Sequence, residues 1–169
     1  MPFETTTLRL WRTLGREERL EAARAFWNRP SEEAAVVAAR EIVQILKVRP
    51  SSFHKIPLEQ RVRAVAGLAA PPEALAEALL VALHVEKRRT LLGAFLDALG
   101  IAHEEGMLPD DADFPAPGEA AVRAAAAELA ARFPPEQIRV YWNTLWLQDR
   151  ERWGALEPAA AALGGGSGS

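Results

Sequence analysis

The chain has 169 residues, of which 49% are apolar and 25% are charged, so the composition indicates a globular protein with a sizeable core and excludes a disordered chain. The formal net charge of −3 favours neither a nucleic-acid-binding protein nor an acidic tail, and the absence of cysteine excludes disulfides, thiolate zinc sites and iron–sulfur clusters. Residues 1–4 lack the basic and apolar regions of a signal peptide, and the most apolar run, 74–85, is too short to cross a bilayer, so we expect a cytoplasmic protein without a membrane span.

The first half of the chain is predicted to form five helices separated by short breaks. Amphipathic spacing and the positions of glycine and proline place them at residues 8–14, 17–27, 32–47, 58–69 and 73–89, with a loop at 50–57. The clearest start is at Ser31, a good N-cap, and Glu32 and Glu33 suit the positive end of the helix dipole.

The second half continues with helical patterns at residues 90–99, 119–133 and 136–153 and a final turn at 159–163. No glycine or proline separates the segments before and after Thr90, so they form either one bent helix or two helices that meet there. Gly100 followed by Ile101 is typical of a Schellman ending, in which glycine takes the left-handed conformation and the next apolar residue packs back. No window alternates like a strand, so we expect no sheet.

One pattern occurs twice in the chain. Residues 62–64 (Val-Arg-Ala) lead through an Ala-rich stretch to Pro-Pro-Glu at 71–73, and residues 122–124 lead in the same way to Pro-Pro-Glu at 134–136. The repetition predicts a helix–turn–helix hairpin that is used twice. The alternative is that Ala-rich amphipathic helices resemble one another and that Pro-Glu is a favoured helix start.

The helices that follow the two copies also align, with Leu75 opposite Ile138 and Leu79 opposite Trp142. We therefore predict an all-α protein: a single domain, residues 1–163, of six to eight helices packed as antiparallel helical hairpins in a bundle or a short α-solenoid. Residues 164–169 have the composition of an engineered flexible linker.

The sequence carries no signature of catalysis or metal binding. The histidines His54, His84 and His103 have no carboxylate three positions away, so di-iron and zinc helix motifs are absent. Residues 110–113 (Asp-Asp-Ala-Asp) lack the spacing of a calcium loop. We predict no catalytic residue, no metal site and no cofactor, and we keep as an alternative a small-ligand binder or enzyme with a pocket between helices near His84 and His103.

The last long helix is aromatic, and it supplies the leading functional hypothesis. Trp142, Trp146, Arg150 and Trp153 fall on one stripe by three- and four-residue spacing, and tryptophan and arginine are enriched at interface hot spots. The stripe predicts a non-enzymatic protein–protein interaction or scaffold module of bacterial origin, with another protein as its partner and the acidic loop 104–113 as a second surface. The alternative is that these aromatic residues pack in the core.

Nucleic-acid binding is the second functional hypothesis. It depends on a stretch with five bases and one acid, extended by three further bases: Lys47, Arg49, Lys55, Arg61 and Arg63, then Lys87, Arg88 and Arg89. The opposing interpretation is that this stretch balances residues 97–119, which carry seven acids and no base.

Overall fold

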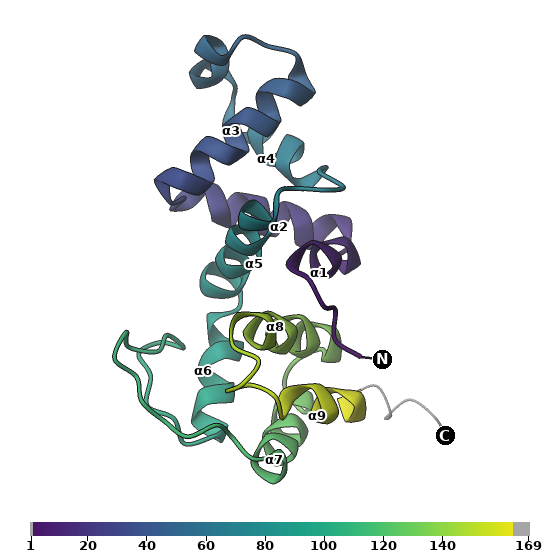
Figure 1. Ribbon diagram of the computed structural model, residues 1–169, viewed down its shortest axis with the longest axis vertical. Helices are drawn as coiled ribbons and strands as arrows, with labels where there is room; N and C mark the ends of the chain where they lie inside the picture. The colour runs from purple at the N-terminus through teal and green to yellow at the C-terminus, as the bar shows by residue number, and fades with distance from the viewer. Residues whose placement is uncertain (1, 164–169) are drawn as a thin grey trace. The chain divides into compact units, whose positions relative to one another are not determined.

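The computed structural model describes residues 2–163, and the regular elements in that range are all helices (Figure 1). In chain order they are α1 (Thr7–Thr13), α2 (Arg16–Asn28), α3 (Glu32–Leu46), the 3-10 helix η1 (Pro50–Lys55), α4 (Leu58–Ala66), α5 (Glu73–Lys87), α6 (Arg89–Ala98), α7 (Glu119–Ala130), α8 (Pro135–Gln148) and α9 (Leu156–Leu163). The all-α prediction is confirmed. None of these helices is both long enough and apolar enough to cross a membrane.

The helix count over the described residues is higher than the predicted six to eight. Pro50 begins a short 3-10 helix inside the expected loop, and Leu156 begins a full helix where only a final turn was expected. Helices α5 and α6 are separate, because the chain breaks at Arg88. The expected linker at residues 164–169 lies outside the described residues.

The helices group into two compact units. Residues 7–87 form one, the inserted unit, and residues 2–6 with 88–163 form the other, the outer unit. Charge differs between them: the inserted unit holds thirteen Lys and Arg against ten Asp and Glu, a formal net charge of +3, and the outer unit holds seven against thirteen, a net charge of −6. The single domain of residues 1–163 stays a prediction, because compactness alone does not show whether either unit folds by itself.

The inserted unit is built around α2. Helices α4 and α5 both pack against α2, α1 packs against α5, and α3 packs against α4 and α5. Apolar side chains fill the space between them: Leu10, Trp11, Ala22, Phe26, Ile42, Val62, Val65, Leu75, Leu79 and Leu83. The indole N–H of Trp11 donates to the Leu68 carbonyl oxygen at 2.9 Å, which satisfies the polar atom that this ring brings into the core.

The outer unit has an aromatic core centred on Phe95 of α6. Its ring centroid lies 5.7 Å from that of Tyr141, 5.4 Å from Trp142 and 5.9 Å from Trp153. Around this cluster α7 and α8 pack against α9, and α6 packs against α7. Aromatic pairs at such separations contribute about 0.5–1.5 kcal/mol each beyond the area they bury, so the cluster is a main source of stability for this unit.

The local sequence signals at the helix ends are confirmed. The Ala34 N–H donates to the Ser31 hydroxyl oxygen at 3.2 Å, which caps α3. At the end of α6 the Ile101 N–H donates to the Leu96 carbonyl at 2.9 Å, and Gly100 has a φ of 69°. These are the bond and the left-handed residue of a Schellman ending.

The two copies of the repeated pattern lie in different units. The first spans α4 and α5 in the inserted unit, and the second spans α7 and α8 in the outer unit. The aligned residues Leu75, Ile138, Leu79 and Trp142 are all fully buried. In each copy, however, the two helices pack mainly on a third one, α2 in the first and α9 in the second. Packing as antiparallel hairpins therefore stays a prediction.

Candidate functional site

Two of the four residues predicted to bind a partner lie in the core. Trp142 is 0% exposed and Trp153 is 4% exposed, and both rings pack on Phe95. Helix α8 ends at Gln148, so Trp153 lies beyond it, in the turns that lead to α9. Neither side chain is exposed to a partner. Trp142 and Trp153 are therefore core residues and not members of an exposed binding stripe. Large apolar residues cover most of the circumference of α8, so helical periodicity could not distinguish its buried face from its exposed face.

The other two residues, Trp146 on α8 and Arg150 two positions beyond its end, reach the surface and contact each other. The guanidinium carbon of Arg150 is 4.3 Å from the centroid of the half-buried Trp146 ring, a cation–π geometry. Phe3 meets the same indole edge to face, with centroids 5.8 Å apart and planes at 67°. Phe3 is only 3% exposed, so the N-terminal segment, residues 2–6, is seated on this helix.

Side chains of α8, and Arg150 just after it, hold the backbone of the N-terminal segment. Arg139 donates to the Pro2 carbonyl oxygen at 2.7 Å, and Arg150 donates to the Thr5 carbonyl oxygen at 3.0 Å. Asn143 contacts Glu4 twice: its Oδ1 accepts the Glu4 N–H at 2.7 Å, and its Nδ2 donates to the Glu4 carbonyl at 3.0 Å. The side-chain amide thus makes with the Glu4 backbone the pair of hydrogen bonds that a residue of a neighbouring β-strand would make.

A fifth contact comes from α9, where the Glu157 carboxylate accepts the Phe3 N–H at 3.2 Å. In Figure 1 the described N-terminal end lies beside α8 and α9. The hydrogen bonds of Arg139, Asn143, Arg150 and Glu157 all reach main-chain atoms of the segment, so they do not depend on its side chains. Phe3 is also anchored by its side chain, between Trp146 and the Arg139 guanidinium, which lies 5.7 Å from the phenyl centroid.

The stripe that contacts the segment is Arg139, Asn143, Trp146 and Arg150. The first three lie on one face of α8 by their spacing of four and three, and Arg150 follows the helix in the turn after Asp149. Sequence analysis identified the second half of this stripe and missed Arg139 and Asn143. The signal that could have identified them is their polarity. Both residues interrupt a mostly apolar run, and both fall on the face of α8 that carries Trp146.

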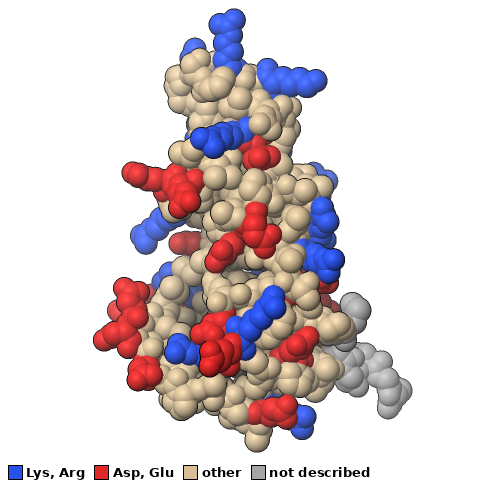
Figure 2. Space-filling model, viewed as in Figure 1, with Lys and Arg blue, Asp and Glu red and all other residues tan. Residues whose placement is uncertain are grey.

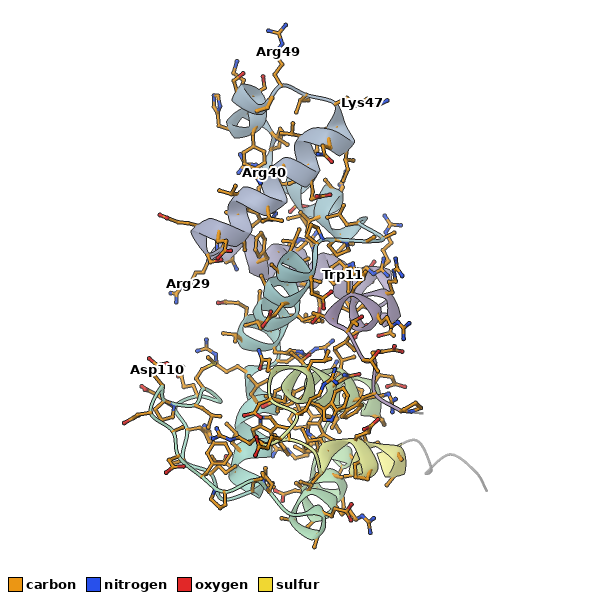
Figure 3. All side chains as sticks on the ribbon, in the orientation of Figure 1. Trp11, Arg29, Arg40, Lys47, Arg49 and Asp110 are labelled. Carbon is orange, nitrogen blue, oxygen red and sulfur yellow. The ribbon has the colours of Figure 1, made fainter. Side chains whose placement is uncertain are left out.

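The predicted basic surface is divided by the fold. Lys47 ends α3 in the left-handed conformation with a φ of 53°, Arg49 precedes η1, and Lys55 ends it. Lys47 and Arg49 point away from the fold (Figure 3), and basic side chains gather over this end of the inserted unit in the space-filling view (Figure 2). These three residues form a small exposed basic tip.

Arg61 has a structural role within the same unit. Its guanidinium donates to the carbonyl oxygens of Ile56, Phe53 and His54 at 3.0, 3.3 and 3.3 Å, and it lies 4.4 Å from the Phe53 ring centroid. These bonds satisfy the carbonyls at the end of η1. Arg61 is therefore committed to holding the loop and adds little to a binding surface.

The remaining basic residues lie apart from this tip. Arg63 is exposed and lines a pocket with residues of α2. Lys87 ends α5 in the inserted unit, whereas Arg88 and Arg89 belong to the outer unit. Arg88 is buried, and Arg89 pairs with Glu105 at 2.8 Å. The eight bases thus do not form one continuous patch within either unit.

His84 and His103, which the sequence placed near one possible pocket, belong to different units. His84 is buried on α5 in the inserted unit, and His103 belongs to the outer unit. The Nδ1 atom of His103 accepts the Gly106 N–H at 2.9 Å, which places the proton of the neutral ring on Nε2, 2.8 Å from the Asp97 carboxylate. Across the described residues, no three histidine or carboxylate side chains are grouped as metal ligands would be.

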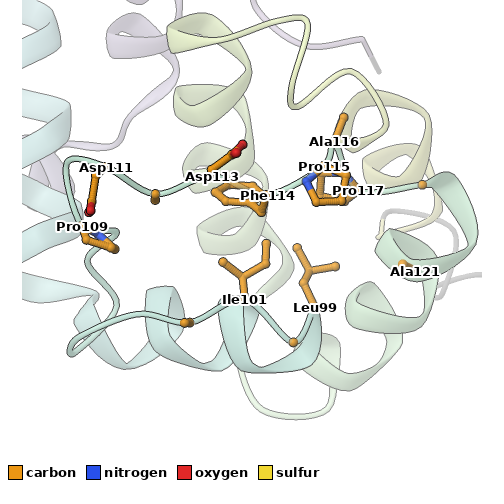
Figure 4. Close-up of a pocket in the computed structure, with 14 residues that line it drawn as sticks. Leu99, Ile101, Pro109, Asp111, Asp113, Phe114, Pro115, Ala116, Pro117 and Ala121 are labelled. Carbon is orange, nitrogen blue, oxygen red and sulfur yellow. The ribbon is translucent and has the colours of Figure 1, made fainter.

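The acidic loop after α6 borders a pocket of about 590 Å³ (Figure 4). Ile101 and Phe114 face each other across it, and Asp113 points away from Ile101. Phe114 anchors the loop, because its ring lies 5.8 Å from that of Trp153 and 4.5 Å from the Arg152 guanidinium carbon. The exposed carboxylates of this loop form the acidic surface seen in Figure 2.

No protein-family model matches the sequence, and no curated protein or solved structure is significantly similar to it. The assignment of function therefore depends on the geometry. That geometry defines an all-α protein in which α8 and neighbouring residues hold the backbone of the chain's own N-terminal segment.

Proposed function

We propose that the protein is a non-enzymatic protein–protein interaction module that binds an extended peptide segment on the face of α8 that carries Arg139, Asn143 and Trp146, together with Arg150 just beyond the helix. The observation that carries the proposal is the seating of the chain's own residues 2–6 on that face. The partner is another protein that presents an extended segment with an aromatic residue at the position of Phe3.

The chemistry of the contacts supports recognition of a peptide in general rather than of one sequence. Arg139, Asn143 and Arg150 contact backbone carbonyl and amide groups, which every peptide offers. Domains that bind extended peptides use the same division, in which main-chain bonds supply affinity and a side-chain pocket supplies specificity. Here the specificity site is the place of Phe3 beside Trp146.

The resident segment competes with any partner, because it is covalently attached. A short tether gives it an effective concentration on the order of millimolar, so a free peptide binds poorly to the intact chain. Replacing Phe3 by Ala removes a fully buried ring, a loss of about 1.5–3 kcal/mol, which shifts docking of the segment roughly 10–150-fold toward the open state. The site on α8 itself is unchanged by this substitution.

The test is binding in trans. A fluorescently labelled peptide with the sequence of residues 2–7 is titrated with the intact chain and with its Phe3→Ala variant, and anisotropy is measured. We expect at least tenfold tighter binding to Phe3→Ala, since the segment no longer competes. Adding Arg150→Gln to that variant should weaken binding, whereas adding Arg123→Gln, an equal loss of charge on the exposed face of α7, should not.

One result would overturn the proposal. Phe3→Ala could keep its helical circular dichroism signal but bind the peptide no better than the intact chain does. The N-terminal segment would then serve only to stabilise the fold, and α8 would not be a recognition surface. Equal weakening by Arg150→Gln and Arg123→Gln would lead to the same conclusion, because the peptide would then be held by general charge.

A further inference from the structure

The inserted unit has a pocket of about 430 Å³ where α2 begins and α4 ends. Three arginines line it, Arg16, Arg19 and Arg63, together with apolar residues that include Leu14, Leu20 and Ala66. Carboxylates are absent from its lining. Arginines 16 and 19 come from the first turns of α2 and Arg63 from α4, so the cluster exists only in the folded chain.

Arg19 is held in place for binding. One terminal nitrogen donates to the Arg12 carbonyl oxygen at 3.1 Å, and the guanidinium carbon lies 5.4 Å from the Trp11 ring centroid. Its Nε is buried and has no hydrogen-bond partner among the described residues. A buried N–H without a partner costs about 1–3 kcal/mol.

Arg16 and Arg63 are available for a ligand. Their side chains make no hydrogen bond or ion pair within the described part of the chain, whereas elsewhere in the same unit Arg24 pairs with Glu59 at 3.2 Å. Three guanidinium groups on one pocket repel each other unless an anion lies between them.

We infer that this pocket is a binding site for a phosphate group carried by a small phosphorylated molecule. Arginine's planar fork donates pairs of hydrogen bonds to phosphate oxygens, and a dianion matches a cluster of three positive charges better than a single carboxylate does. The volume of about 430 Å³ exceeds what one phosphate needs, and Leu14 and Leu20 offer apolar contact to the rest of the molecule.

The site is independent of the function proposed for α8. It lies wholly within the inserted unit, and the residues that hold the N-terminal segment lie in the outer unit. Failure of one proposal leaves the other unaffected, because the two are tested with different ligands and different variants.

The experiment uses the intact chain with inorganic phosphate and pyrophosphate as probes. Calorimetry measures affinity, and the Nε–H resonance of Arg19 in nuclear magnetic resonance spectra reports contact at the pocket. We expect saturable binding, tighter for pyrophosphate, and a shift of the Arg19 resonance. Arg63→Gln should weaken binding about tenfold or more, since a charge-assisted hydrogen bond is lost. Arg29→Gln, at the opposite end of α2 (Figure 3), should not change it.

Three outcomes would overturn the inference. The first is the absence of saturable binding by either probe. The second is an equal loss of affinity in Arg63→Gln and Arg29→Gln, which would indicate general charge attraction. The third is tight binding of a single-stranded oligonucleotide that persists in Arg63→Gln. That result would place anion binding at another basic surface, such as the tip at Lys47.

Discussion

Gly106 is the position where one added methyl group should have the largest effect on the outer unit. It is the second central residue of a tight turn in which Glu104 and Met107 exchange two backbone hydrogen bonds of 2.9 Å. Glu105 and Gly106 both have positive φ, 50° and 83°, as a type I′ turn requires. The turn also packs directly against α6.

Two costs follow for Gly106→Ala. A Cβ at this residue would lie 2.7 Å from the Leu92 Cβ and 2.9 Å from the Gly93 nitrogen, so either the turn or α6 must move. Overpacking of this kind costs about 1–3 kcal/mol, and a left-handed alanine costs about 1–2 kcal/mol. We expect a total loss of about 2–5 kcal/mol in the free energy of unfolding, limited by the cost of detaching the turn from α6.

Gly100→Ala is the matched control. Gly100 also has positive φ, 69°, but an added Cβ there meets nothing within 4 Å. Only the left-handed cost applies, about 1–2 kcal/mol. Urea unfolding of the two variants and the parent chain measures both losses. Equal destabilisation by Gly100→Ala and Gly106→Ala would refute the reasoning, because it would show that the close packing of the turn on α6 carries no energy.

Two further predictions concern α8 and α3. Burial raises the pKa of Tyr141 above its ordinary value of 10.0, so the unfolded state loses this proton first and the free energy of unfolding should fall above about pH 10, by up to about 1.4 kcal/mol per pH unit. Urea unfolding between about pH 9 and 11 should show a shallower decline for Tyr141→Phe, and identical slopes would contradict this assignment. Ser31→Ala should cost about 1 kcal/mol through loss of the α3 cap, whereas Ser51→Ala, at an exposed position in η1, should stay within about 0.5 kcal/mol in the same assay.

The features that could be predicted from the sequence are those encoded by neighbouring residues. The cap at Ser31 and the ending at Gly100 and Ile101 each depend on residues within one turn of a helix, and both were predicted correctly. The break at Arg88 was left open, because the helical pattern continues through it and no glycine or proline marks the end of α5.

The candidate site could be predicted only in part, for two physical reasons. The first is the orientation of α8 about its own axis. Because α8 is apolar around most of its circumference, periodicity could not determine which of Trp142 and Trp146 faces the core. The second is distance along the chain: Glu4 and Asn143 are 139 positions apart, and no local pattern links them. The polarity of Asn143 could therefore mark a polar position on α8, but nothing in the sequence pairs it with Glu4 or Phe3.

Displacement of the N-terminal segment from α8 would change how the chain connects the inserted unit to the outer unit. The chain passes between the two units twice, after Thr6 and after Lys87. While residues 2–6 are seated on α8, both passages join the inserted unit to the body of the outer unit. If a partner displaces the N-terminal segment, only the passage between Lys87 and Arg88 remains. Under the proposed function, peptide binding would therefore leave one chain connection, in place of two, between the inserted unit and the packed helices of the outer unit.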